Sequence, residues 1–196
     1  MLSDITLYFI RHGETDWNRI QRYQGQTDIP LNDTGRAQAA RNGRVLGDLL
    51  DTAKDHFDYV ASPLERAVET MAIVRANMGL APHPFKTDDR LKEQNFGHWE
   101  GLTWSELPRL DPEGFAARLA DTWHWTPRNG ENYDMVRARV QPWLDGLERD
   151  TVVVSHGNIS RTIRGIVLGL DPAVVPKLEV PQDKVLRLTA GRAEWL

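Results

Sequence analysis

Short apolar runs alternate with longer amphipathic stretches along this chain. Runs rich in β-branched and aromatic residues occur at 5–10, 57–62 and 150–155, with a weaker one at 83–91, and they predict strands. Between them, apolar residues recur every three or four positions. This spacing predicts helices over about 32–50, 63–78, 132–148 and 159–170, with Asn32 or Thr34 capping the first. The tail, 184–196, is typical of a hairpin that turns near Ala190-Gly191.

Strands that alternate with helices predict an α/β fold, here a three-layer α/β/α sandwich with a mainly parallel central sheet. The continuous apolar run at 152–154 suits a sheet that is covered on both faces. No linker or internal repeat interrupts the pattern, so residues 1–196 are predicted to form a single domain. Residues from about 94 to 131 lack strand signals and predict a helical flap, with short helices at 103–110 and 112–121. This flap holds Trp99, Trp104, Trp123 and Trp125 of the seven tryptophans.

Composition narrows the classes of function. The 196 residues include no cysteine, which excludes disulfides, thiolate metal sites and a cysteine nucleophile. A net charge of −4 gives no support to a nucleic-acid partner. No run approaches the ~18 apolar residues of a membrane helix, and the N-terminus lacks the features of a signal peptide. We expect a cytoplasmic protein without a nucleic-acid or membrane partner. A monomer and a homodimer both stay open.

Two predicted strands are each followed by a histidine and a glycine. The first runs into Arg11-His12-Gly13, and the strand at 150–155 runs into His156-Gly157. Ligands of doubly wound sheets bind beyond the carboxyl ends of the strands, so both imidazoles should face one crevice. Each glycine lets the backbone turn sharply and lets a ligand approach.

The neighbouring side chains indicate a phosphoryl ligand. Arg11 adjoins one histidine and Arg66 follows the second strand, and guanidinium groups match phosphate oxygens bidentately. One histidine can attack phosphorus and become a phosphohistidine, while the other donates hydrogen bonds to the phosphoryl oxygens. A backbone carbonyl near Gly13 is the candidate that fixes the tautomer of the nucleophile. Glu93 is the candidate general acid, with Glu100 as its rival, because a carboxyl beside an anionic phosphate can hold a proton.

Four stretches carry a family resemblance: "RHGETDWN", "SPLERA", "LKEQNFGHWEG" and "VVVSHGN", in this order. Together they resemble the histidine phosphatase superfamily, in its phosphoglycerate mutase-like branch. The resemblance implies an α/β/α sandwich and phosphotransfer through a phosphohistidine, with no metal and no cofactor. It implies His12 as the nucleophile and Glu93 as the acid. It also implies that Arg11, Arg66 and His156 form a phosphate pocket. The implied substrate contacts are Asn18, Gln24, Gly25, Gly157 and Asn158.

Departures from the family pattern favour hydrolysis. The mutases carry a tyrosine three residues after the acid, where this chain has Phe96, and an adjacent arginine pair that grips a second acidic group. Between Gly101 and Asn132 only isolated arginines occur, at 109, 118 and 128. We therefore predict a metal-independent phosphatase that hydrolyses phosphomonoesters of small molecules. A cofactor-dependent phosphoglycerate mutase and a non-catalytic module that binds phospho-ligands are the alternatives.

Two further interpretations concern a possible metal site and the tryptophans of the flap. His12, His156 and Glu93 could in principle bind zinc, but Arg11 argues against a metal beside a cation. The flap tryptophans are expected in a local core, with the sharper hypothesis that some of them line the leaving-group side of the crevice.

Overall fold

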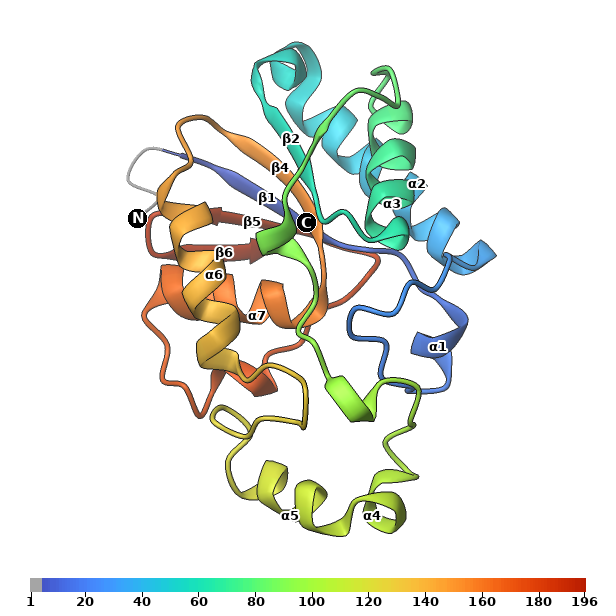
Figure 1. The fold of residues 1–196 in the computed structure, drawn as a ribbon. Helices are drawn as coiled ribbons and strands as arrows, with labels where there is room; N and C mark the ends of the chain where they lie inside the picture. The colour runs from blue at the N-terminus through green and yellow to red at the C-terminus, as the bar shows by residue number, and fades with distance from the viewer. Residues whose placement is uncertain (1–4) are drawn as a thin grey trace.

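The central element is a six-stranded mixed sheet in the order β3-β2-β4-β1-β5-β6 (Figure 1). The structure, a computed structural model, describes residues 5–196. The N-terminal segment that lacks the features of a signal peptide therefore lies partly outside the described residues. Neighbours from β3 to β1 pair in parallel, whereas β5 runs antiparallel to β1 and β6 antiparallel to β5. The strands are β1 (Leu7–Arg11), β2 (Asp58–Ala61), β3 (Lys86–Thr87), β4 (Thr151–Ser155), β5 (Val185–Thr189) and β6 (Arg192–Trp195).

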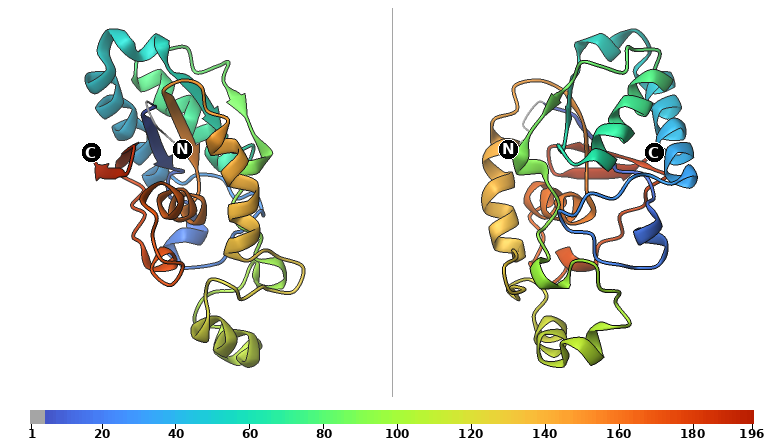
Figure 2. Two further views of the ribbon diagram at one scale, coloured as in Figure 1. Left: turned by 90° about the vertical axis from the view of Figure 1, so that its left-hand side faces the viewer. Right: turned by 45° about the vertical axis from the view of Figure 1, so that its right-hand side comes forward.

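Helices cover both faces of this sheet, as Figure 2 shows from two further sides. The pair α2 and α3 packs on one face, and α6 and α7 pack on the other, which confirms the three-layer α/β/α sandwich. The α-helices are α1 (Asp16–Arg19), α2 (Asp33–Leu50), α3 (Glu65–Asn77), α4 (Leu107–Leu110), α5 (Pro112–Ala120), α6 (Tyr133–Asp145) and α7 (Gly157–Leu168). Short 3₁₀ helices occur at η1 (Asp51–His56), η2 (Asp89–Leu91), η3 (Gly97–Trp99) and η4 (Val175–Lys177).

Alternation along the central strands divides the core into two layers. In β1, Leu7 and Phe9 belong to the core beneath α6 and α7, whereas Tyr8 and Ile10 belong to the core beneath α2 and α3. Side chains of a strand point to opposite faces in turn, so a run without polar residues implies two buried faces. The prediction made from the continuous apolar runs is therefore confirmed.

The strand near 83–91 and the start of α3 differ from the sequence prediction for clear physical reasons. The weak strand expected at 83–91 shrinks to Lys86–Thr87, because the Asp88 carboxylate accepts the Arg90 N–H at 2.9 Å and begins η2. Helix α3 begins at Glu65 rather than at Pro63, since Leu64 is extended and forms its N-cap. Of the two caps predicted for α2, Asn32 is confirmed, because its side-chain oxygen accepts the Gly35 N–H at 2.9 Å.

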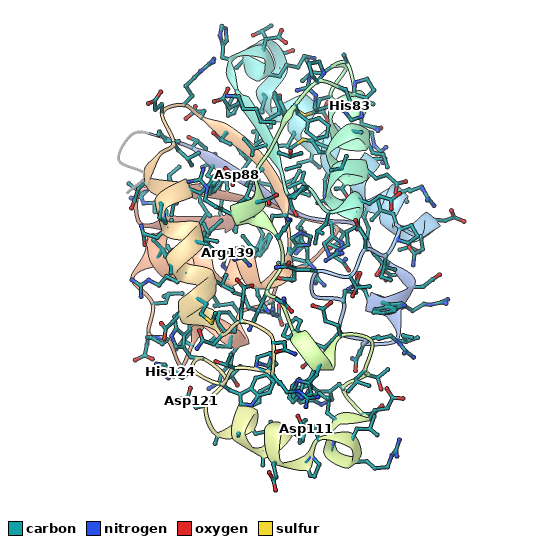
Figure 3. The ribbon with its side chains drawn as sticks, viewed as in Figure 1. His83, Asp88, Asp111, Asp121, His124 and Arg139 are labelled. Carbon is teal, nitrogen blue, oxygen red and sulfur yellow. The ribbon has the colours of Figure 1, made fainter. Side chains whose placement is uncertain are left out.

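The flap lies apart from the three layers, at the bottom of Figure 1, and contains α4 and α5. Its small core includes Phe96, Trp99 and Leu107, with Trp125 packed against them. Asp111 holds it together, because its carboxylate accepts the Trp99 indole N–H at 2.7 Å and the Gly114 N–H at 3.0 Å (Figure 3). Across residues 5–196, no helix has the length and apolarity required to cross a membrane.

Candidate active site

His12 stands at the carboxyl end of β1 with its tautomer fixed. Its backbone N–H donates to the carbonyl of Ser155 in the adjacent strand β4, at 2.8 Å. The ring Nδ1 lies 2.8 Å from the carbonyl oxygen of Gly13, which can only accept, so Nδ1 carries the proton. Nε2 is left with a free lone pair. The prediction that a carbonyl at Gly13 orients this ring is confirmed.

The surroundings of His12 keep the ring neutral. Only 3% of the residue is exposed, and burial lowers its pKa well below the usual 6.5. The positive charges of Arg66 and Arg11 lower this pKa further, against a smaller opposing effect of the Gly13 hydrogen bond. A neutral imidazole with a free Nε2 is the form that can act as a nucleophile.

His156 occupies the equivalent place at the end of β4, where it forms the N-cap of α7. Its ring centroid lies 5.1 Å from that of His12, and its Nε2 lies 2.7 Å from the Ser62 hydroxyl oxygen. Since that oxygen also accepts the Leu64 N–H at 3.4 Å, the hydroxyl proton is free to point at Nε2. When the Ser62 hydroxyl donates to Nε2, Nδ1 carries the ring proton, and this buried atom has no hydrogen-bond partner within residues 5–196.

Both arginines predicted from sequence lie beside the histidines, Arg66 buried and Arg11 partly buried. Arg66 is fully buried and donates to the carbonyls of Thr27 and Gly25, at 2.9 and 2.7 Å. Arg11 donates to the carbonyl of Val180 at 2.9 Å, and burial lowers its pKa to about 10, so it stays cationic at neutral pH. The Nε atoms of both are buried and lack a partner among the described residues. Backbone carbonyls thus hold the two guanidinium groups in place, and their remaining N–H donors can bind an anion.

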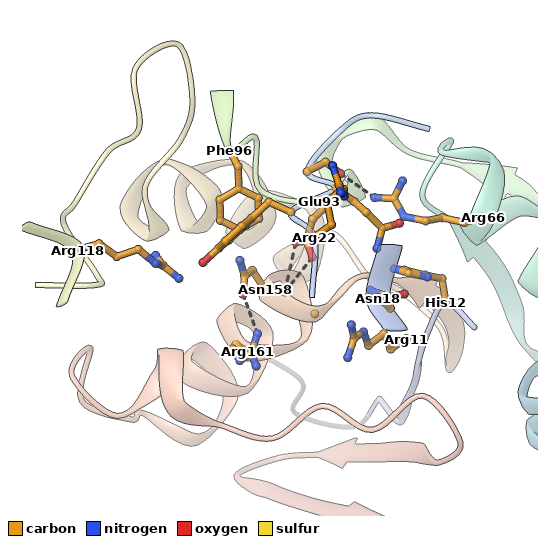
Figure 4. Close-up of a pocket in the computed structure, with 14 residues that line it drawn as sticks. Arg11, His12, Asn18, Arg22, Arg66, Glu93, Phe96, Arg118, Asn158 and Arg161 are labelled. Carbon is orange, nitrogen blue, oxygen red and sulfur yellow. Dashed lines mark hydrogen bonds between the residues drawn. The ribbon is translucent and has the colours of Figure 1, made fainter. Parts of the chain in front are cut away.

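Glu93 lies between η2 and η3, and its carboxylate contacts the first turn of α7. One of its carboxylate oxygens accepts the backbone N–H groups of Gln94 and Asn158, at 2.9 and 3.2 Å. Asn158 is held in turn, because its side-chain oxygen accepts from the Tyr133 hydroxyl at 2.7 Å and its amide nitrogen donates to Gln94. The carboxyl group therefore has a defined position at the rim of the pocket (Figure 4).

Glu100, the rival to Glu93, has a structural role. Its carboxylate accepts the backbone N–H groups of Gln26, Thr27 and Phe96, at 3.0 to 3.1 Å. These bonds shape the loop around Gly25, whose φ of +51° suits glycine, and a Cβ there would lie 2.0 Å from the Glu100 carboxylate. Glu100 orders the loop whose carbonyls hold Arg66.

These groups line one pocket of about 230 Å³. Nine of the ten site residues predicted from sequence line it. The tenth, His156, lies behind the lining against the His12 ring. The lining comprises Arg11, His12, Asn18, Arg22, Tyr23, Gln24, Gly25, Arg66, Glu93, Phe96, Arg118, Gly157, Asn158 and Arg161. Among the described residues, no three His, Asp or Glu side chains group as metal ligands, so His12, His156 and Glu93 do not form such a set.

Sequence reasoning missed part of this lining. Arg22, Arg118 and Arg161 reach the pocket from the loop after α1, from α5 and from α7. These arginines come from three segments that are distant in the sequence, so a search for adjacent arginines does not find them. Arg161 could have been found, since it lies four residues after Gly157 and therefore on the same helix face. Arg22 and Arg118 carry no comparable signal.

A second, outer hollow of about 570 Å³ adjoins the pocket and shares Arg11, Asn18, Arg22, Tyr23 and Arg161 with it. It adds Gln21 and Trp104, which is 40% exposed. Trp99 and Trp123, by contrast, are buried in local cores. Only Trp104, of the four flap tryptophans, lies on the outer side of the site.

Comparison with known proteins agrees with this geometry. The model of the histidine phosphatase superfamily (branch 1) matches residues 7–196. The chain is 33% identical over 189 residues to a glucosyl-3-phosphoglycerate phosphatase of Mycobacterium tuberculosis, covering 88% of this chain and 79% of that protein. It is 30% identical over 168 residues to a metal-independent phosphoserine phosphatase of Arabidopsis thaliana, covering 82% and 68%.

Among solved structures, a mycobacterial glucosyl-3-phosphoglycerate phosphatase in complex with VO3 superposes with a TM-score of 0.81. The two chains are 30% identical, and the match covers 97% of this chain and 96% of the other. Family match and fold agree over nearly the whole chain. The chain belongs to the histidine phosphatase superfamily.

Proposed function

We propose that this protein is a metal-independent phosphatase that hydrolyses phosphomonoesters through a phosphohistidine on His12. One observation carries the proposal: around the free Nε2 of His12, three buried nitrogens lack a partner within the described residues. These are Arg11 Nε, Arg66 Nε and His156 Nδ1. Burying such donors unpaired is costly, and a phosphoryl group supplies the acceptors they lack.

In the first half of the reaction, His12 Nε2 attacks phosphorus while the bond from phosphorus to the ester oxygen breaks. Arg11, Arg66 and His156 donate to the equatorial oxygens, where charge is greatest in the transition state. Glu93 gives its proton to the departing oxygen, so the alcohol leaves neutral. Asn18, Gln24, Gly25, Gly157 and Asn158 contact the substrate from the walls of the pocket.

In the second half, the Glu93 carboxylate takes a proton from a water molecule that attacks the phosphohistidine. The bond from nitrogen to phosphorus breaks, phosphate leaves, and His12 returns to its neutral form with Nδ1 still bonded to Gly13. The same carboxyl serves as acid and then as base, so each turnover restores the starting protonation state.

The proposal extends beyond the pocket to the domain and its location. Residues 1–196 act as one histidine phosphatase domain, with the flap at about 94–131 over the leaving-group side. Relatives named for glucosyl-3-phosphoglycerate and phosphoserine support a small phosphorylated metabolite as the substrate. We further propose that the enzyme acts in the cytoplasm, where such metabolites occur and where a cysteine-free chain needs no oxidising conditions.

Phosphate release from a panel of phosphomonoesters in the presence of EDTA tests the proposal. We expect the wild type to release phosphate and His12→Ala to lose at least about 10³-fold in rate, since the nucleophile is gone. The exposed His56→Ala serves as the matched control and should keep full activity. Isomerisation of phosphoglycerate without hydrolysis would identify the mutase instead. Tight binding of esters without either reaction would identify a binding module.

A further inference from the structure

The pocket holds more positive charge than a phosphoryl group requires. Five arginines line it, against the single carboxylate of Glu93. Arg11 and Arg66 serve the phosphoryl group in the proposed function, which leaves Arg22, Arg118 and Arg161 unassigned. A bound phosphoryl dianion therefore still leaves an excess of two positive charges, or three when the acid is protonated. Such an excess in a confined space favours a ligand with a further negative charge.

Within residues 5–196, no carboxylate forms an ion pair with any of these three arginines, whereas nearby Arg139 pairs with Glu131 at 2.9 Å. Arg161 is oriented by bonds from Nε to the Leu178 carbonyl and from Nη1 to the Asn158 side chain, both 2.8 Å. Arg22 donates to the Gly101 carbonyl at 2.6 Å. Neutral acceptors thus position these cations without neutralising them.

Arg118 is the most informative of the three. Its guanidinium lies 5.6 Å from the centroid of the Trp125 ring, and its Nη1 is buried without a hydrogen-bond partner among the described residues. A desolvated donor of a cation without a partner is costly unless a ligand completes it. Figure 4 shows Arg118 reaching in from the flap at the end of the pocket opposite Arg66, with Arg161 below it.

We propose that Arg118, together with Arg161 and Arg22, binds a second acidic group, so that the preferred substrates are phosphomonoesters whose leaving group carries a carboxylate or a phosphate. This inference rests on the proposed phosphatase function and specifies its substrate class. The acidic group would lie between the phosphoryl clamp and the outer hollow beside Trp104, which leaves room for a larger leaving group. The grip differs from an adjacent arginine pair because its members come from three segments.

Matched ester pairs test this substrate class. O-phosphoserine and O-phosphoethanolamine differ only in the carboxylate, and 3-phosphoglycerate and glycerol 3-phosphate differ in a carboxylate against a hydroxymethyl group. For the wild type we expect kcat/KM at least tenfold higher for the acidic member of each pair, since each ionic hydrogen bond contributes strongly. In Arg118→Gln this preference should fall at least tenfold, mainly through KM, and Arg118→Lys should restore part of it. Arg109→Gln, an exposed flap arginine, should leave the preference unchanged.

The outcomes separate the two proposals. If the wild type hydrolyses both members of each pair equally, or if Arg118→Gln affects both equally, the second acidic group is wrong while the phosphatase stands. If p-nitrophenyl phosphate is not hydrolysed either, the phosphatase fails and this inference fails with it.

Discussion

At the residue scale, the site keeps its arginines charged and its nucleophilic histidine neutral. Arginines must stay charged beside a histidine that must stay neutral, and burial acts on both groups in the same direction. Burial lowers the pKa of Arg11 to about 10, which leaves it cationic, and lowers the pKa of His12 from 6.5, which leaves it neutral. Because the usual pKa values differ by about six units, one desolvated pocket holds each group in its useful form.

The role of Glu93 predicts a dependence on the leaving group. Glu93→Gln removes the proton donor but keeps the size and the amide contacts of the side chain. We expect kcat/KM for an alkyl phosphate to fall by about 10²–10⁴-fold, because the alkoxide then leaves unprotonated. For p-nitrophenyl phosphate, whose leaving group needs no proton, we expect a loss at least tenfold smaller. The parameter kcat/KM reports phosphoryl transfer to His12 and not the later hydrolysis.

Glu113→Gln, at an exposed position in α5, is the matched control and should change neither ester. An equal loss for both esters in Glu93→Gln would remove Glu93 from the role of acid and would leave it a structural part of the rim.

The sequence was sufficient for those site residues whose neighbours carry information. His12, Arg66, Glu93 and His156 stand in motifs at strand ends, and the order of the strands brings strand ends together. Ser62 and Arg118 could not be found in this way. Their roles depend on side-chain directions across the fold: Ser62 bonds to the His156 ring, and Arg118 enters from a flap without a motif.

At the scale of elements, the helix pair α2 and α3 is set by close backbone approach. A Cβ on Gly43 of α2 would lie 2.5 Å from the carbonyl oxygen of Val74 in α3. One turn later, a Cβ on Gly47 would lie 3.2 Å from the nearest atom, the Cα of Met78. The first distance requires the helices to move apart, whereas the second requires a shift of a few tenths of an ångström.

This difference predicts the relative stability of two variants. Alanine adds about 1 kcal/mol of helix propensity at either position, and overpacking opposes it by about 1–3 kcal/mol. We expect Gly43→Ala to be less stable to urea than Gly47→Ala by at least about 1 kcal/mol in the free energy of unfolding. The two variants are each other's control, since helix and substitution are the same. Equal stabilities would mean that the helices separate without loss of packing.

Helical periodicity located these elements, but their ends followed local contacts that a pattern of apolar residues does not contain. The strand expected at 83–91 ends early because Asp88 caps a 3₁₀ turn, and α3 starts at Glu65 because Leu64 stays extended. The flap helices were found near their observed positions, at Leu107–Leu110 and Pro112–Ala120. What the pattern could not give was the face of α5 that delivers Arg118 to the pocket.

At the scale of the whole molecule, overall charge and site charge have opposite signs. The chain carries a net charge of −4, yet five arginines meet in one pocket. An acidic surface repels anionic substrates weakly through salt-screened solvent, while the pocket attracts them over a few ångströms in a medium of lower dielectric constant. The net charge of the chain therefore argues against a broad basic surface, but it does not indicate whether a local cationic site is present.

The two buried histidines also link the active site to the stability of the molecule. Burial and the neighbouring cations lower the pKa of both His12 and His156 below 6.5 in the folded state, whereas the unfolded chain restores the ordinary value. As the pH falls below about 6.5, the unfolded state takes up protons that the folded state refuses. The contribution of each neutral ring is complete above this pH and is lost as the pH falls toward the folded-state pKa.

We therefore expect the free energy of unfolding in urea to decrease between pH 6.5 and 5.5 by up to about 2 kcal/mol, because each of the two rings goes from about half to about nine-tenths protonated in the unfolded state over this range. His12→Asn and His156→Asn should each lose about half of this slope, whatever they do to stability at neutral pH, because each removes one titrating ring. A double variant with the wild-type slope would show that other groups bind the protons. A slope that halves and then vanishes would mean that the two rings proposed to hold and transfer the phosphoryl group also set the acid limit of the fold.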